Sequence, residues 1–200
     1  TGGEPLLRQD LFAILDYVRK CGFSTSLMSN GTLIDGDMAR RIREAGVSDV
    51  QISLDGLEPA HESLRGKGSF KRTLEGIRNL VSHGVEANLT VSRLDMNETG
   101  ELVRLAEELG VGAIAFSRLV PTGRGKGLNS EALTREEVAH FYDGLKGFKD
   151  HSKVVVTSRD PLSAIADMEG EIPRTEMPVG GCAAGIFGVT ITADGTIMPC

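Results

Sequence analysis

The chain repeats one unit along most of its length: an amphipathic helical segment, a glycine that ends it, and a short apolar or β-branched run. The helix ends are marked by glycines that each precede an apolar residue: Gly22, Gly46, Gly84 and Gly110. Glycine just past a helix is an expected stop, because the left-handed conformation costs it little. Runs typical of strands follow at 25–29, 50–54, 87–91 and 113–117. Strands alternating with helices predict parallel pairing through right-handed crossovers, and hence an α/β fold.

The alternation changes after about residue 120, where a basic, glycine-rich loop covers 121–127. Thr134 with Glu137 predicts a capping box for a helix that runs to about Lys149. A short strand is expected at 153–157, a short helix at 161–168 and a linker at 169–181, with a β-hairpin turning at Asp194–Gly195. We therefore divide the chain into a main body (1–150), a connecting segment (151–181) and the start of a small second domain (182–200).

Composition narrows the choice of partners and compartment. The 200 residues carry a net charge of −6, which argues against nucleic acid or an anionic membrane as the main partner. No apolar run approaches the roughly 20 residues needed to span a bilayer. Three cysteines are too few for a secreted disulfide framework, so a reducing compartment, the cytoplasm, is expected.

The chain opens on a glycine-and-acid loop, Thr1-Gly2-Gly3-Glu4-Pro5, followed by a helix over 11–18 that Asp10 is expected to cap. Adjacent glycines allow the backbone to approach a ligand closely. Such a loop normally follows a strand, so we expect the chain to be an internal piece of a larger protein.

Polar clusters follow each predicted strand, at the edge of a parallel sheet where ligands bind. They are Ser29-Asn30-Gly31, Ser53-Leu54-Asp55-Gly56, Thr90 with Ser92 and Arg93, and Ser117-Arg118. Each could also be an ordinary turn, since Asn-Gly and Asp-Gly pairs form turns readily. Arg65, in a predicted loop, is either a solvated cation or a carboxylate clamp. The four histidines, His61 among them, lack paired spacing and are expected to be surface or internally satisfied residues.

The cysteines separate into two groups. Cys21 ends the first helix and is expected to serve packing. Cys182 and Cys200 flank the predicted hairpin as Cys-x12-Gly-x4-Cys, a glycine-turn setting typical of iron–sulfur or zinc ligands. A disulfide or two idle thiols is the alternative for this pair.

Together these motifs resemble those of radical S-adenosylmethionine (SAM) enzymes with a C-terminal SPASM auxiliary-cluster domain. Gly2-Gly3-Glu4-Pro5 resembles the family's Gly-Gly-Glu-Pro motif, and Ser53-Leu54-Asp55-Gly56 resembles its fourth-strand motif. The segment from Cys182 to Cys200 is similar to the opening of the SPASM pattern. The resemblance implies a partial (β/α)6 TIM-like barrel, its first strands missing, and then the start of a small SPASM hairpin domain.

The resemblance also implies roles for single residues. Gly3 and Glu4 would hold the amino group of the SAM methionine, and Ser29 with Asn30 would lie near its ribose. Ser53, with Asp55 in the same motif, would help to bind SAM, and Arg65 would lie near its carboxylate. Cys182 and Cys200 would ligate an auxiliary 4Fe–4S cluster.

One departure concerns the catalytic 4Fe–4S cluster. The family's Cys-x3-Cys-x2-Cys loop has no counterpart in this sequence. We therefore expect the chain by itself to be inactive and the longer parent protein to be the enzyme.

For that parent, the resemblance implies reductive cleavage of SAM to a 5′-deoxyadenosyl radical that abstracts hydrogen from substrate. The electron would come from a flavodoxin or a ferredoxin. The run 120–125 and the segment 181–185 most resemble the haem and haem d1 synthesis branch, so a tetrapyrrole precursor is the expected substrate. Arg118 and Arg124 would then meet its carboxylates. The alternatives are a radical SAM/SPASM peptide or protein maturase, a non-catalytic barrel, and an α/β domain that binds a phosphorylated metabolite.

Overall fold

The computed structural model describes residues 3–92, 95–117, 133–158, 188–192 and 194–198. The chain divides into two units, one holding the described residues up to Ser158 and the other those from Gly188 onward. The predicted helix at 161–168 and the linker at 169–181 lie outside the described residues. No helix in the described part of the chain is long and apolar enough to cross a membrane.

The first unit is built on a five-stranded parallel sheet. Its strands are β1 (Ser26–Ser29), β2 (Asp49–Ser53), β3 (Ala87–Val91), β4 (Ala113–Phe116) and β5 (Val155–Ser158). They lie side by side in chain order, and each neighbouring pair is parallel. An order without reversal is typical of a barrel rather than of an open doubly wound sheet. The α/β fold and the partial barrel are thereby confirmed.

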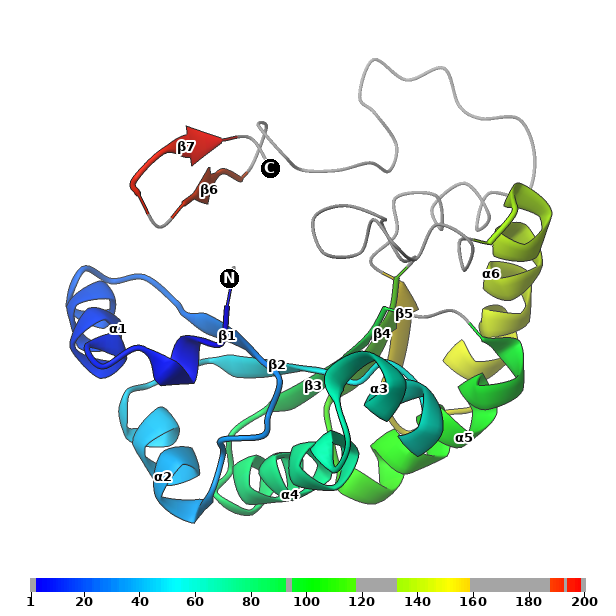
Figure 1. The fold of residues 1–200 in the computed structure, drawn as a ribbon, viewed down its shortest axis with the longest axis horizontal. Coiled ribbons are helices and arrows are strands. Elements are labelled where there is room, and N and C mark those ends of the chain that lie inside the picture. The colour runs from blue at the N-terminus through cyan, green and yellow to red at the C-terminus, as the bar shows by residue number, and fades with distance from the viewer. Residues whose placement is uncertain (1–2, 93–94, 118–132, 159–187, 193, 199–200) are drawn as a thin grey trace. The chain divides into compact units, whose positions relative to one another are not determined.

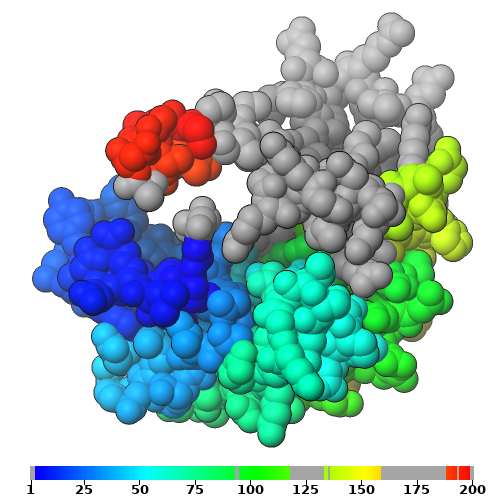
Figure 2. Space-filling model, viewed as in Figure 1, coloured from blue at the N-terminus to red at the C-terminus, as the bar shows by residue number. Residues whose placement is uncertain are grey.

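Two helices precede β1, and the others of the first unit lie between successive strands. They are η1 (Pro5–Leu7), α1 (Leu11–Lys20), α2 (Gly36–Glu44), α3 (Glu58–Arg65), α4 (Ser69–Ser82), α5 (Met96–Leu109) and α6 (Arg135–Lys149). Figure 1 shows α2, α4 and α5 along the outer side of the curved sheet, with α3 above the start of α4. In Figure 2, η1 and α1 (dark blue) and α3 (cyan) lie on the same visible face of this unit.

The two sides of β2 and of β3 differ in burial. Val50 and Ile52 of β2 are fully buried, whereas Gln51 and Ser53 are half-buried. Successive side chains of a strand point to opposite faces. The apolar set therefore packs under the outer helices, and the polar set lines the opposite face of the sheet.

The predicted helix ends are confirmed by backbone geometry. The four stop glycines have positive φ angles between 69° and 82°, the left-handed region that other residues avoid: Gly22, Gly46, Gly84 and Gly110. The capping box of α6 is also present, with Thr134 and Glu137 bonded to each other's backbone N–H groups. The expected cap at Asp10 is wrong, because that carboxylate pairs with the Arg8 guanidinium and makes no bond to the helix.

Two further features of the first unit were not expected from the sequence pattern. Helix α3 covers a segment read as loop, although Pro59 near its start and Gly66 after its end are typical helix boundaries. Strand β5 pairs with β4, so the sheet extends past residue 150.

The described part of the second unit is a hairpin of β6 (Thr190–Ile191) and β7 (Ile197–Met198), which are antiparallel. The Asp194 carboxylate accepts hydrogen bonds from the Thr192 hydroxyl and the Thr196 N–H. Gly195 has a φ of 86°. The predicted hairpin around Asp194–Gly195 is confirmed, and its assignment to a SPASM domain remains a prediction.

Candidate functional site

The Glu4 carboxylate joins the opening loop to the loop that follows β1. Its Oε1 accepts a hydrogen bond of 2.8 Å from the Ser29 hydroxyl and one of 3.3 Å from the Leu6 N–H. Its Oε2 accepts one of 2.8 Å from the Asn30 N–H. Hydrogen bonds to a charged acceptor are stronger than neutral ones. Three of the predicted site residues are therefore held in direct contact.

The β1 loop is itself a tight turn. The Ser29 hydroxyl oxygen accepts the Gly31 N–H at 3.0 Å, and Gly31 has a φ of 79°. The Asn30 side-chain oxygen accepts both the N–H and the hydroxyl of Thr32, at 2.8 and 2.7 Å. Among the described residues nothing binds the Asn30 carboxamide nitrogen, so this part of the side chain is available to another group.

Helix α4 supports this loop from below, through two residues that the sequence analysis missed. The fully buried Thr73 donates its hydroxyl to the Asn30 carbonyl at 2.9 Å. One turn later, Gly76 allows the Gly31 carbonyl to approach so closely that a β-carbon there would lie 2.1 Å from it. A glycine inside an otherwise regular helix was the available signal, because glycine costs helix stability and needs a packing reason.

A second cluster lies at the end of the neighbouring strand β2. Asp55 is 4% exposed, and its carboxylate forms an ion pair with the Nε of Arg65. Its other oxygen accepts the Ser92 N–H at 3.3 Å. Arg65 is therefore paired with Asp55 in this structure, and its role as a clamp for a ligand carboxylate stays a prediction. The Arg65 side chain is 31% exposed, and among the described residues its hydrogen bond to Asp55 is made by Nε and not by a terminal amino group.

Helix α5 also contacts the turn after Asp55. The Glu98 carboxylate accepts the Leu57 N–H at 3.0 Å. Gly56, with a φ of 109°, fits between Glu98 and Ala60, since a β-carbon there would lie 2.8 Å from both. The backbone from Asp55 to Leu57 thus has little freedom to move.

His61 of α3 belongs to this cluster. Its ring is completely buried, packs edge-on against Phe70 with centroids 5.7 Å apart, and accepts the Asp55 N–H on Nδ1 at 3.2 Å. Burial lowers the pKa of His61 below its usual 6.5, and the positive charge of Arg65 lowers it further. The ring is therefore neutral near pH 7. The sequence alternatives were a surface or an internally satisfied histidine; the ring is buried, but only its Nδ1 has a hydrogen-bond partner among the described residues.

Ser53 lies half-buried at the end of β2, in register with Thr90 of β3. Ile52 is the register partner of Ser29, so the Glu4 cluster and the Asp55 cluster occupy adjacent strand ends. Gly3 is exposed, and a β-carbon there would meet no described atom within 4 Å. Close approach at Gly3 would therefore concern a ligand and not the packing of the chain itself.

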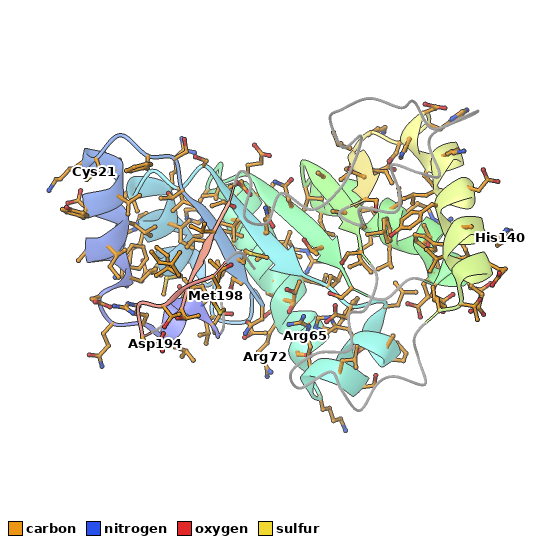
Figure 3. The ribbon with its side chains drawn as sticks, turned by 90° about the horizontal axis from the view of Figure 1, so that it is seen from above. Cys21, Arg65, Arg72, His140, Asp194 and Met198 are labelled. Carbon is orange, nitrogen blue, oxygen red and sulfur yellow. The ribbon has the colours of Figure 1, made fainter. Side chains whose placement is uncertain are left out.

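The remaining predicted residues divide by position. Those that lie outside the described residues are Gly2, Arg93, Arg118, Arg124, Cys182 and Cys200. Cys21 is a free, exposed thiol, so its expected packing role is wrong. Figure 3 shows Cys21 at the end of α1, well away from Arg65. Within the described part of the chain, no group of three or more His, Cys, Asp or Glu side chains could hold a metal ion.

With this geometry established, comparison with known proteins identifies the family. The model of the radical SAM superfamily matches residues 1–109, which include the Glu4 cluster, the Asp55 cluster and the helices that support them. This chain belongs to the radical SAM superfamily. Enzymes of the superfamily use SAM together with a 4Fe–4S cluster.

Several curated relatives of this radical SAM chain have names related to haem. It is 36% identical to an AdoMet-dependent heme synthase of Oleidesulfovibrio alaskensis, over 100% of this chain and 55% of the relative. It is 36% identical to an Fe-coproporphyrin III synthase of Methanosarcina barkeri, over 72% of this chain and 37% of the relative. A pre-heme d1 synthase of Dinoroseobacter shibae is 29% identical, over 100% of this chain and 54% of the relative. The chain thus spans about half the length of these relatives.

Solved structures share the fold. SuiB of Streptococcus suis, solved with SAM bound, matches with a TM-score of 0.79 at 15% identity, over 100% of this chain and 47% of SuiB. The protein anSMEcpe with bound AdoMet matches with a TM-score of 0.62 at 21% identity, over 78% of this chain and 48% of anSMEcpe. At these identities the likeness supports the fold alone.

Proposed function

We propose that this chain is the SAM-binding part of a radical SAM oxidoreductase that abstracts hydrogen from a tetrapyrrole precursor. The main support for the substrate class is the 36% identity to an AdoMet-dependent heme synthase across the whole chain. Support for SAM comes from an anion at Glu4 and a cation at Arg65, which contact the residues that follow the adjacent strands β1 and β2. The amino acid end of SAM carries one charge of each sign, so the two clusters suit it.

The Glu4 carboxylate can bind an ammonium group while it keeps its hydrogen bonds to the protein. A carboxylate offers about four lone-pair sites, and Ser29, Asn30 and Leu6 occupy three of them. The remaining site on Oε2 can accept the methionine ammonium, with the Gly3 backbone beside it. The bonds from Ser29 and Asn30 fix the carboxylate in place before any ligand arrives, which reduces the cost of binding.

The Arg65 fork fits the carboxylate of the same ligand. Asp55 engages Nε, so the terminal amino groups present N–H donors in a fixed plane for a second anion. The Ser53 hydroxyl, at the neighbouring strand end, would add a hydrogen bond. Gly2 and Asn30 are proposed to complete the pocket, Gly2 through its backbone and Asn30 through its carboxamide nitrogen.

When bound, SAM and a reduced 4Fe–4S cluster supply one-electron chemistry that ends in hydrogen abstraction from substrate. The residues described above bind and orient the amino acid end, so that the reacting end is presented in one geometry. For the parent protein we further propose an auxiliary 4Fe–4S cluster on Cys182 and Cys200. Arg118 and Arg124 are proposed contacts for substrate carboxylates, and a flavodoxin or ferredoxin the electron donor.

The test is anaerobic reconstitution of the full-length protein with iron and sulfide, followed by assay of 5′-deoxyadenosine. We expect its formation to rise when tetrapyrroles bearing propionate side chains are added, and not when peptides are added. A rise with peptides alone would assign the protein to the maturases. Failure to bind iron or SAM would contradict the radical SAM activity itself.

A further inference from the structure

Helix α3 contacts Asp55 at two separate points. His61 Nδ1 accepts the Asp55 backbone N–H at 3.2 Å, and Arg65 Nε pairs with the Asp55 carboxylate. The two residues are four positions apart in α3 and therefore share one face of the helix. One helical turn thus binds both the backbone and the side chain of a single aspartate.

The bond to Asp55 fixes the protonation of the His61 ring. An imidazole nitrogen that accepts an N–H carries no proton, so the ring proton is on Nε2. That Nε2 is buried and has no hydrogen-bond partner among the described residues. Burying an unpartnered polar group is costly, and a phenylalanine would fill the same space without that cost. What histidine adds at this position is the acceptor for the buried Asp55 N–H.

The consequence reaches Arg65 through Asp55. The Ser92 N–H binds the other oxygen of the Asp55 carboxylate, and Glu98 fixes the adjacent backbone at Leu57. With its N–H also held, Asp55 has one orientation, and the plane of the Arg65 guanidinium follows from it. Without the His61 acceptor, the Asp55 N–H would need another partner, and the peptide plane next to the carboxylate would rotate.

We propose that His61 is a positioning residue, which holds Asp55 so that the terminal amino groups of Arg65 meet the carboxylate of SAM. The inference rests on the proposed SAM-binding function of this site. His61 touches neither substrate nor cofactor in this proposal, and it acts only through Asp55 and Arg65. Replacing His61 should therefore weaken the binding of only those ligands that have the carboxylate.

The experiment measures dissociation constants of the full-length, cluster-containing protein for SAM and for decarboxylated SAM, which lacks the carboxylate. His61→Phe keeps the ring volume and removes the acceptor. His61→Asn keeps an acceptor near the Nδ1 position. We expect His61→Phe to weaken SAM binding by about tenfold, the effect of one lost charge-assisted hydrogen bond. The dissociation constant of His61→Phe for decarboxylated SAM should stay within about twofold of the wild-type value. His61→Asn should retain most of the wild-type affinity for SAM.

The coupling to Arg65 is tested with Arg65→Gln. The double variant His61→Phe/Arg65→Gln should bind SAM no more weakly than Arg65→Gln alone, because both changes remove the same contact. Additive losses, equal losses for both ligands, or unchanged SAM affinity in His61→Phe would each overturn the inference. If His61→Phe does not fold, His61→Gln, whose amide oxygen reaches past the Nδ1 position, takes its place in the comparison with His61→Asn. Wild-type protein that binds neither ligand would contradict the proposed function, and the inference with it.

Discussion

The carbonyl oxygen of Gly31 occupies space that a β-carbon on Gly76 would need, at a separation of only 2.1 Å. Gly76 is buried in the interior of α4, and Gly31 belongs to the loop that holds Glu4. The helix and the candidate site therefore fit together only when residue 76 has no side chain. This contact links the stability of the unit to the geometry of the site.

From this contact we expect Gly76→Ala to lower the free energy of unfolding by about 1 to 3 kcal/mol, the usual range for overpacking. The Gly31 oxygen is a backbone atom, and the position of a β-carbon is set by the backbone, so neither can rotate away. Chemical denaturation monitored by circular dichroism measures the change.

Gly147→Ala is the matched control for that measurement. Gly147 lies within α6, and a β-carbon there would meet no described atom within 4 Å. Alanine should stabilise this helix by about 0.5 to 1 kcal/mol, because glycine loses more backbone entropy on folding. If both substitutions had the same effect, the close approach at Gly31 would not constrain the fold.

Thr73→Val should destabilise the first unit by about 1 to 3 kcal/mol, because it leaves the Asn30 carbonyl without its donor in a buried setting. Valine has nearly the same shape as threonine, so packing should change little. Thr73→Ser keeps the hydroxyl and removes only the methyl group near Gly31. We expect the serine variant to lose less stability than the valine variant, and the reverse order would show that packing outweighs the hydrogen bond.

Glu4→Gln should loosen the junction between η1 and the β1 loop. The amide has one oxygen in place of two, so it cannot accept hydrogen bonds from both Ser29 and Asn30 in the present geometry. We expect faster hydrogen exchange of the Asn30 amide and SAM binding weakened by about tenfold or more, since a charged partner is lost. Unchanged exchange at Asn30 in this variant would contradict the hydrogen bond to Glu4.

His61 should make stability depend on pH between its folded pKa and its usual value of 6.5. Burial lowers the folded pKa, so in this window the unfolded chain binds more protons than the folded protein. The stabilisation is complete above the unfolded pKa and decreases as the pH falls toward the folded one. As the pH falls below about 6.5, we expect the wild-type protein to lose unfolding free energy relative to His61→Asn. A difference that is constant with pH would show that His61 does not titrate in this way.

Parts of the site could be predicted because short local residue patterns indicated them. Asn30-Gly31 and Asp55-Gly56 directly follow apolar runs, so the end of a strand and a turn could be read from the sequence alone. His61 gave no such signal. Its importance depends on α3 turning back over the end of β2, and no local pattern indicates which backbone N–H a buried ring will meet.

The sequence by itself determined several helix ends, because those boundaries depend on local chemistry: glycine at Gly22 and Gly84, and a capping box at Thr134. It also determined that polar residues gather at one edge of a parallel sheet. Only the tertiary structure decided their partners: Glu4 with Asn30, and Asp55 with Arg65 and His61. Those pairings depend on strand register and on how α3 and α4 pack, which are set by long-range burial and not by neighbours in the chain.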